Sequence, residues 1–402
     1  MVFKTREIRC WADFFSVLEQ IMADTIFKLD PEIITGPDTV NRAGSLFSGR
    51  GSKILVATEQ GLYEQKHIER FIKILEDAGI ETILFDEIPA QATADVAENA
   101  ASLARGARCD MVVGLGGLRT QYIARLVSIL AVSKLGLFDL LDGKKEEKAF
   151  LPYAALPTAV GDPFLFSDNL IAVDPRDRFV KLIKCPRFLC QLVILDPVLS
   201  EPLTGKLAST AAFDGLCASI EAYCSVKANF LSDALLEQAI SLYAGMMHSY
   251  IENQAADFPA IAYDAGLLMS LGASICAPGI GTALSYALGG KFPVSKSWCA
   301  TVLLPYVMEK LVASRPEKMA KVAALMGEIV EGISTAEAAN MTVDTVRRRM
   351  GQLSVPARLK DFNLSLDRLV PVADAARNLE FVAYSPYTVA SEDAYDLLKQ
   401  SY

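Results

Sequence analysis

Two kinds of hydrophobic spacing divide this chain and constrain its fold. In the first half, short runs rich in β-branched residues alternate with stretches of helical periodicity, beginning at residues 53–57. From Leu207 onward the spacing is helical almost to the end of the chain. Strands that alternate with helices predict a parallel sheet wound by right-handed crossovers. We therefore expect an α/β N-terminal domain with a parallel Rossmann-like sheet, followed by an all-α C-terminal domain.

The predicted elements of the first half follow one another closely. The expected strands are residues 53–57, 82–85, 111–113, 153–157, 170–173 and 192–195. The expected helices are residues 63–78, 92–105 and 120–135. Because Asp196 and Pro197 mark the exit from the sheet, we expect three parts. They are an N-terminal helical extension over residues 1–25, an α/β nucleotide-binding-like domain over 26–197, and an all-helical domain over 198–402.

Composition and charge argue against several classes of protein. The chain has 402 residues, of which 52% are hydrophobic and 22% charged, as in globular proteins large enough for two domains. A net charge of −9 and the lack of a basic run argue against a surface for nucleic acid or anionic membrane. The first residues lack the apolar core of a signal peptide, and no apolar stretch is long enough to span a membrane. We expect a cytoplasmic protein.

Histidine and cysteine usage restricts the chemistry further. The chain has two histidines, His67 and His248, and each lies within a helical pattern. Counting alone therefore nearly excludes a transition-metal site built from two or three histidines. The eight cysteines are scattered without a CxxC pair, so we expect reduced and mostly buried thiols.

The stretch from Gly279 to Pro305 shows a resemblance to a known family. It reads GIGTALSYALGGKFPVSKSWCATVLLP and closely resembles the iron-containing alcohol dehydrogenase pattern GLGxVHxLAHxLGGxxxxPHGxxNAxLLP, without a gap. The closing SPYTVASEDAYDLLKQSY resembles the family's NPRPxxxEDxxxLLxxAY, so the resemblance covers about residues 26 to 402. It implies a dehydroquinate synthase-like fold and an NAD-linked oxidoreductase for a small alcohol or aldehyde. It also implies a small-molecule ligand in the interdomain cleft and a homodimer.

Most of the family's metal ligands are missing from this chain. The family reads MDALTHAIEAY where this chain reads FDGLCASIEAY, which keeps Asp214 but places Ala218 at the histidine position. The other two metal-binding histidines of the family fall on Thr282 and Lys296, and the histidine of its active-site cleft falls on Tyr286. One carboxylate would not retain a divalent cation, so we expect no bound metal.

We hypothesise that an ion pair between Lys296 and Asp214 replaces the metal. In the structural interpretation, the ammonium satisfies a carboxylate that would otherwise be buried alone. In the catalytic interpretation, Lys296 donates a proton to a carbonyl oxygen or polarises it, with Tyr286 as a second donor. Asp214, Lys296 and Tyr286 are thus the candidate catalytic residues.

A glycine turn after the third predicted strand is a candidate phosphate site. The family reads GGGSxxDxAK there, whereas this chain reads GGLRTQYIAR and keeps Gly116 and Gly117. Glycines let backbone amides approach a pyrophosphate at a helix N-terminus. Arg119 replaces the serine and either pairs with a phosphate or fills the site from the protein side. Tyr122 replaces the acid of the family pattern.

Two further positions match cofactor contacts of the family. The family's PTTxGTGSE corresponds to PTAVGDPFL, which keeps Thr158 but introduces Asp162, a charge unfavourable beside a pyrophosphate. Glu59, at the end of the first predicted strand, matches the family's acid near the adenosine ribose. A carboxylate there favours NAD over NADP, although a solvated acid at a strand end is an equally good interpretation.

Three interpretations stay open at this point. The chain is an NAD-linked oxidoreductase that works without metal through Lys296 and Tyr286, or a catalytically silent scaffold with a binding or regulatory role. In the third interpretation, the two-domain cleft serves a different reaction. Changes at both the nucleotide and the metal positions favour the silent scaffold on physical grounds, whereas the resemblance favours the oxidoreductase.

Overall fold

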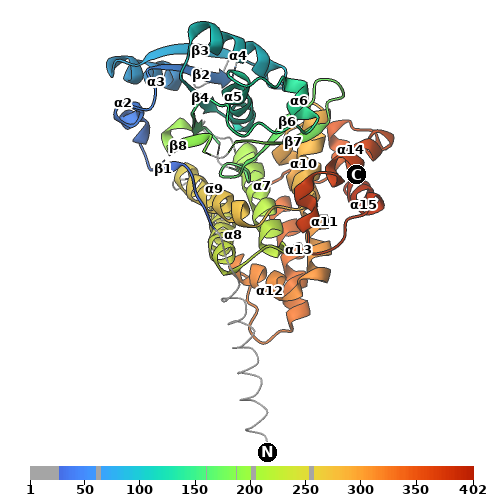
Figure 1. The fold of residues 1–402 in the computed structure, drawn as a ribbon. Helices are drawn as coiled ribbons and strands as arrows, with labels where there is room; N and C mark the ends of the chain where they lie inside the picture. Colours follow the sequence, from blue (N-terminus) through green and yellow to red (C-terminus); the bar gives the residue numbers. More distant parts are fainter. Residues whose placement is uncertain (1–26, 60–64, 160, 187, 201–204, 253–257) are drawn as a thin grey trace, which may run out of the picture.

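A sheet of six strands, all parallel, forms the centre of the first half (Figure 1). The computed structural model describes residues 27–59, 65–159, 161–186, 188–200, 205–252 and 258–402. The strand order is β1-β8-β5-β4-β2-β3. The strands are β1 (Glu32–Thr35), β2 (Lys53–Glu59), β3 (Glu81–Ile88), β4 (Met111–Gly116), β5 (Tyr153–Pro157) and β8 (Cys190–Leu195). The predicted parallel α/β architecture is confirmed.

Helices cover both faces of this sheet. Successive residues of a strand point to opposite faces, so one strand contributes side chains to two hydrophobic cores. Ile54 and Val56 of β2 belong to one hydrophobic core, which includes Phe71 of α3. Leu55 and Ala57 belong to the other core, which contains α4 and α5. The helices of this half are α2 (Ala43–Phe47), α3 (Gln65–Asp77), α4 (Val96–Ala107), α5 (Leu118–Leu130) and α6 (Leu137–Leu141).

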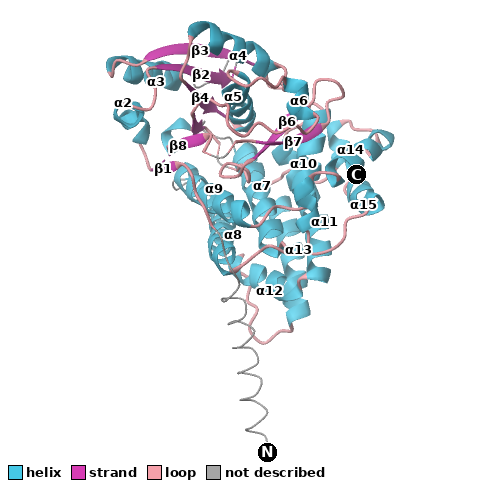
Figure 2. Cartoon of the chain, viewed as in Figure 1, coloured by secondary structure: helices cyan, strands magenta, loops and turns pink. Residues whose placement is uncertain are grey.

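The structure adds a small antiparallel hairpin that lies outside the main sheet (Figure 2). It consists of β6 (Asn169–Val173), which was predicted as an extended piece, and β7 (Val180–Lys184), which was missed together with β1. Both missed strands are short, and β7 carries two lysines that mask its apolar alternation. The predicted helices 92–105 and 120–135 begin or end several residues away from α4 and α5.

The second half is helical in the part that the structure describes, as predicted. A short 3₁₀ turn, η2 (Pro197–Leu199), follows β8 and leads toward this half. The helices are α7 (Gly205–Cys224), α8 (Phe230–Ile251), α9 (Phe258–Ile275), α10 (Ile280–Lys291), α11 (Lys296–Ser314), α12 (Pro316–Leu325), α13 (Thr335–Gln352), α14 (Val370–Arg377) and α15 (Ser391–Gln400). The predicted extension over residues 1–25 lies outside the described residues, and the division at residue 197 stays a prediction.

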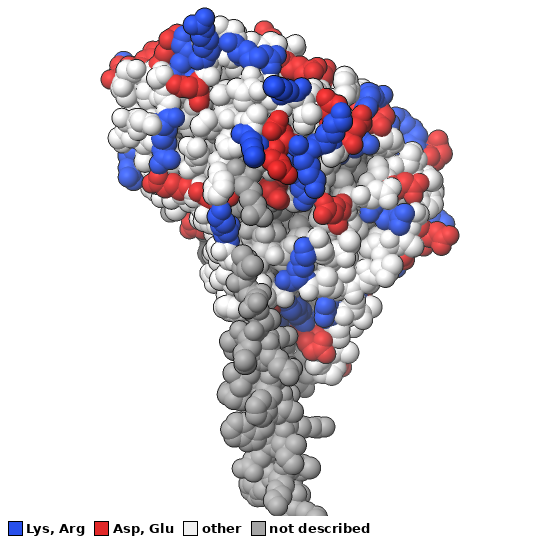
Figure 3. Space-filling view, in the orientation of Figure 1, with Lys and Arg blue, Asp and Glu red and all other residues white. Residues whose placement is uncertain are grey.

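The surface carries both signs of charge. Figure 3 shows acidic and basic side chains interspersed over the visible face of the α/β half. No single described helix is long and apolar enough to cross a membrane. The pair α9 and α10 passes that test only together, bent by 109°. Seven cysteines lie in the described part of the chain, and all are free thiols, six of them buried.

Candidate functional site

Two cavities meet where the sheet half faces the helical half. The cleft cavity (≈470 Å³) is lined by Gly117 and Arg119 from the sheet side and by Tyr286 and Lys296 from the helical side. The inner cavity (≈260 Å³) is lined mainly by apolar and tyrosine side chains of α7, α8 and α9. Leu118 and Ser297 line both cavities. The predicted site residues therefore divide between two adjoining spaces.

An ion pair between Lys296 and Asp214 lies at the junction of the two cavities. Lys296 Nζ is 2.6 Å from Asp214 Oδ1, and Ser297 Oγ donates to Asp214 Oδ2 at 2.8 Å. The side chains are only 11% and 9% exposed, so water screens this pair weakly. Asp214 lines the inner cavity and Lys296 the cleft cavity. The structure thus brings together the two residues predicted to pair.

Tyr286 meets this centre with its ring rather than with its hydroxyl. Lys296 Nζ lies 4.7 Å from the ring centroid, where a cation is attracted by the aromatic face. The Tyr286 hydroxyl lies 2.8 Å from the Tyr122 hydroxyl, which donates to Asp162 Oδ1 at 2.6 Å. Burial raises the pKa of both tyrosines well above the usual value. Proton donation by Tyr286 therefore stays a prediction.

Glu221 explains why Thr282 does not face the ion pair. Glu221 is buried on α7, and its carboxylate accepts from Gly281 N at 2.6 Å and from Thr282 N at 2.9 Å. The Thr282 hydroxyl donates to the same carboxylate at 2.6 Å. The first turn of α10 is thereby capped by a carboxylate, an arrangement that suits the positive end of a helix. Burial nevertheless raises the pKa of Glu221.

The glycine turn is held by Glu59. The carboxylate Oε1 accepts from Gly117 N and from Thr120 Oγ1, both at 2.7 Å. A Cβ at Gly117 would lie 2.9 Å from that oxygen, so a larger residue there would displace the Glu59 carboxylate. Gly116 precedes it at φ +154°. Glu59 therefore occupies the amide that a bound phosphate would use, and its predicted contact with a ribose stays a prediction.

Two cations line the cleft cavity. Lys296 is paired with Asp214, whereas Arg119 has no hydrogen-bond or ion-pair partner among the described residues. In that part of the chain Arg119 makes neither a hydrogen bond nor an ion pair, and burial lowers its pKa while nearby Glu59 opposes the shift. Thr158 lies elsewhere, in the wall of the inner cavity, with its N–H donating to Gly116 O at 3.0 Å. Arg119 is thus the residue best placed to receive an anion.

The comparisons with known proteins identify the family. Residues 30–197 match the description "Iron-containing alcohol dehydrogenase", and residues 208–402 match "Fe-containing alcohol dehydrogenase family, C-terminal". This chain belongs to the iron-containing alcohol dehydrogenase family. Its similarity to the 1,3-propanediol dehydrogenase of Citrobacter freundii is 25% identity, covering 82% of this chain and 86% of the relative. An NAD-dependent methanol dehydrogenase of Bacillus methanolicus is 22% identical and covers 94% of this chain and 100% of the relative.

A solved structure agrees with this assignment at the level of the fold. A 1,3-propanediol oxidoreductase structure superposes with a TM-score of 0.86 and 24% identity, covering 94% of this chain and 100% of that chain. The recognition made from the stretch Gly279 to Pro305 is thereby confirmed, as is the predicted fold.

The residues at the family's metal positions do not fit a transition metal. Ala218 offers no ligand atom, Thr282 donates its hydroxyl to Glu221, and Lys296 brings its own positive charge to Asp214. No group of three or more histidine, cysteine or acidic residues suited to a metal occurs in the described ranges. Among the described residues at the family's metal positions, Asp214 alone offers a carboxylate ligand, and the expectation that no metal is bound stays a prediction.

Asp162 corrects one expectation from the sequence. It does not lie in the cleft cavity beside a pyrophosphate site, as its place in the loop suggested, but in the wall of the inner cavity. Tyr122, which stands where the family has an acid, donates to Asp162 instead. The family pattern has a carboxyl group at the position of Tyr122 on α5, whereas this chain has one at Asp162 in the facing loop. The two substitutions, Tyr122 for an acid and Asp162 in the loop, are the sequence signal for this contact, but they do not indicate which cavity Asp162 faces.

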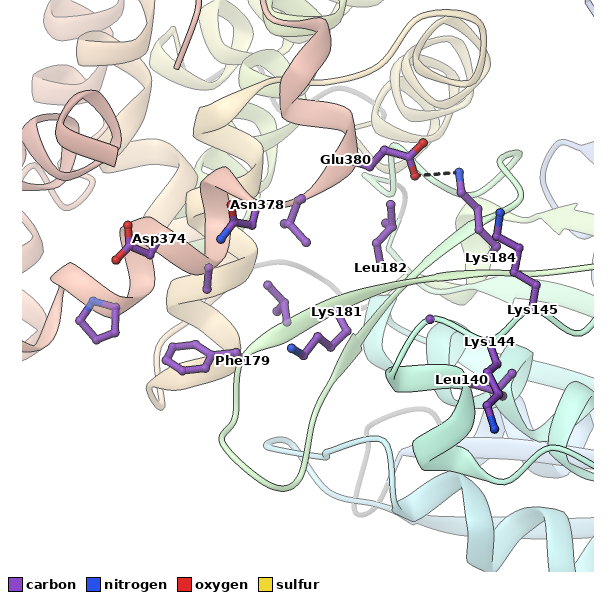
Figure 4. Close-up of a pocket in the computed structure, with 15 residues that line it drawn as sticks. Leu140, Lys144, Lys145, Phe179, Lys181, Leu182, Lys184, Asp374, Asn378 and Glu380 are labelled. Carbon is purple, nitrogen blue, oxygen red and sulfur yellow. Dashed lines mark ion pairs between the residues drawn. The ribbon is translucent and has the colours of Figure 1, made fainter. Parts of the chain in front are cut away.

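A third cavity lies apart from these residues. The basic cavity (≈630 Å³) is lined by Lys144, Lys145, Lys181 and Lys184 together with residues of α14. Figure 4 shows Lys184 paired with Glu380 from the helical half, at 3.4 Å. It contains none of the predicted site residues, so the candidate active site is the junction of the cleft and inner cavities.

Proposed function

We propose that this protein is an NAD-linked oxidoreductase for a small alcohol or aldehyde, and that the Lys296 ammonium acts in place of the family's metal ion. The observation that carries the proposal is the buried ion pair with Asp214, which joins a cavity with phosphate-binding features to an apolar cavity. A cation at that junction is suited to stabilise the negative charge that develops on a carbonyl oxygen during reduction. Family membership supports the class of reaction.

The cleft cavity suits a dinucleotide because its wall combines Gly117 of the glycine turn with Arg119, which has no hydrogen bond or ion pair within the described part of the chain. In this proposal, Gly117 N–H and the Arg119 guanidinium would hold a pyrophosphate, and the Glu59 carboxylate would accept from ribose hydroxyls instead of from Gly117 N–H. A carboxylate at the ribose repels a 2′-phosphate, which favours NAD over NADP. The relative named for NAD dependence supports this choice.

Each residue of the ion-pair centre has a distinct task in this mechanism. NADH, when bound, would supply the hydride that reduces the carbonyl group. Lys296 donates one N–H hydrogen to the substrate oxygen and transfers that proton as the alcohol forms, and solvent in the cleft restores it. The Asp214 carboxylate holds the Lys296 side chain in place, and the Ser297 hydroxyl holds that carboxylate. The ring of Tyr286 stabilises the ammonium from one side.

Oxidation of NADH with a panel of short aldehydes tests this proposal, using purified untagged protein with and without a chelator. We expect turnover that a chelator leaves unchanged, together with less than one-tenth of a metal ion per chain by elemental analysis. A stoichiometric iron or zinc content that supports turnover would contradict the metal-free mechanism. The silent-scaffold interpretation instead predicts no turnover with any aldehyde.

Two properties that follow from the family resemblance belong to the same proposal, a homodimer and a small-molecule ligand in the cleft. We also propose that the protein is cytoplasmic and has neither nucleic-acid nor membrane partners. The mixed surface charge and the net charge of −9 support the exclusion of these partners.

A further inference from the structure

The wall of the inner cavity contains two buried polar atoms without a hydrogen-bond partner among the described residues. They are Asp162 Oδ2 and the hydroxyl of Tyr243. Asp162 is 6% exposed and Tyr243 1% exposed, so neither reaches bulk water. Buried polar groups in folded proteins are almost always paired, and an unpaired one costs free energy. Two such atoms in the wall of one cavity are available as hydrogen-bond partners for a polar ligand.

The chemistry of the two atoms restricts what that ligand is. A carboxylate oxygen accepts hydrogen bonds, and a phenol oxygen also accepts them besides donating its own hydrogen, so one ligand can donate to both. Asp162 Oδ1 is already used, since it accepts from the Tyr122 hydroxyl at 2.6 Å and from Phe164 N at 2.9 Å. Only Oδ2 is left for the ligand. A group with several N–H donors fits this requirement better than a single hydroxyl.

The charges around Asp162 also favour a ligand that donates hydrogen bonds. No ion pair of Asp162 occurs in the described part of the chain, although the charges of Arg125 and Lys296 act on it at longer range. Arg125 donates to the carbonyl oxygens of Phe164 and Ser167, at 3.1 and 2.6 Å. Lys296 is bound to Asp214. The inner cavity therefore has one carboxylate in a direct ion pair, Asp214, and one without a direct ion pair, Asp162. Burial raises the pKa of Asp162, and the charges of Arg125 and Lys296 oppose that shift.

The remaining walls suit a positively charged group. Tyr243, Tyr250 and Tyr263 line the cavity together with Met246. Aromatic faces attract an ammonium group and replace part of the water that it loses on burial. A volume of ≈260 Å³ limits the ligand to a small organic molecule.

We propose that the inner cavity binds the protonated amine of a small amino alcohol or amino aldehyde, with Asp162 as its counter-ion and Tyr243 as a second acceptor. The oxygen-bearing end of the substrate then points to the junction at Ser297 and Lys296. This inference rests on the proposed function, because it names the substrate class of the same site. Asp162 and Tyr243 are specificity-determining residues in this view.

Calorimetric titration of the full chain with three molecules of matched size tests the inference. The probes are 3-aminopropan-1-ol, propane-1,3-diol and butan-1-ol, which differ in the group at one end. We expect the amine to bind at least about tenfold more tightly than either neutral probe at pH 7.5. Asp162→Asn removes this preference, and Tyr243→Phe weakens amine binding several-fold.

Tyr122→Phe is the matched control, because it breaks the bond to Asp162 Oδ1 but leaves Oδ2 and the cavity wall intact. We expect it to retain the preference for the amine. Equal binding of the three probes, or an unchanged preference in Asp162→Asn, would overturn the inference. NADH formation from NAD⁺ is measured in parallel. Selective amine binding without NADH formation supports the inference and refutes the oxidoreductase, whereas turnover of neutral alcohols with no amine preference does the reverse.

Discussion

Two buried aspartates line the same cavity and differ in how their charge is matched. Asp214 has a partner for each oxygen, Lys296 for Oδ1 and Ser297 for Oδ2. Asp162 has neutral donors on Oδ1 and no partner on Oδ2 among the described residues. Both oxygens of Asp214 therefore have partners without a ligand. Asp162 Oδ2 is the oxygen to which a ligand can donate.

The difference shows how a site that lacks the family's metal ligands remains foldable. A buried charge without a counter-charge costs several kcal/mol, so Asp214 alone at the metal positions would destabilise the folded protein. Lys296 removes that cost because it supplies a positive charge at the same point. Asp162 retains an unfavourable burial, and unfavourable arrangements of this kind are typical of sites that bind a ligand. The predictions that follow test this contrast.

The largest effect is expected from Lys296→Met, which removes the ammonium group that pairs with Asp214. The free energy of unfolding should fall by about 3–5 kcal/mol, because the variant leaves a buried carboxylate uncompensated. Any measured aldehyde reduction should fall at least about 100-fold if Lys296 donates the proton. Denaturant unfolding and steady-state kinetics measure the two effects separately.

Two further variants separate structure from catalysis. Lys310→Met on the same helix removes an exposed ion pair with Asp393, at 3.6 Å, and should cost at most about 1 kcal/mol. The double variant Lys296→Met with Asp214→Leu should recover most of the lost stability without recovering turnover. Turnover that returns with stability would show that the ion pair has a structural role alone.

Asp162→Asn should stabilise the folded protein, and its effect should depend on pH. Burial raises the pKa of Asp162, so its stabilising proton is present below the ordinary aspartate pKa and is lost as the pH rises through the folded pKa. The asparagine oxygen keeps the bonds from Tyr122 and Phe164. We expect a gain on the order of 1 kcal/mol at pH 9 and a smaller one at pH 5.

Asp174→Asn provides a control of opposite sign. Asp174 is buried but paired with Arg176 at 2.7 Å, and hydrogen bonds from that guanidinium lower its pKa. Its contribution to stability is present above the ordinary aspartate pKa, so the asparagine variant should lose stability at pH 9. Melting curves across this pH range decide the issue. A loss of stability in both variants would remove the contrast between matched and unmatched carboxylates.

The sequence was sufficient to predict the pairing of Lys296 with Asp214 but not the surroundings of Asp162. The first followed from a gap-free match, in which two residues at known metal positions had to lie close together. The second depended on which side of a loop a side chain occupies, and no periodicity encodes that. Tyr243 was missed for a similar reason, since an apolar stripe on α8 does not reveal which phenol hydroxyl stays unpaired.

The fold shows the same division between what spacing encodes and what it does not. Buried central strands such as β2 and β4 stand out as apolar runs, because both of their faces are covered. The edge strand β1 is short and half-exposed, so its sequence carries little signal. Glu59 was placed at the end of β2 by spacing, but its bond to Gly117 depends on how two loops approach.

A third carboxylate, Glu59, extends the comparison to the cleft cavity and should give the smallest effect. Glu59→Gln keeps an oxygen for Gly117 N and Thr120 Oγ1 but removes the charge. We expect the preference for NADH over NADPH to fall about tenfold, because the repulsion of a 2′-phosphate is lost. Inorganic pyrophosphate should bind several-fold more tightly. Glu69→Gln on the exposed face of α3 is the matched control, because it also removes one negative charge. It should change neither the preference for NADH over NADPH nor the affinity for pyrophosphate. An unchanged cofactor preference in Glu59→Gln would mean that this carboxylate caps the glycine turn and does not select the cofactor.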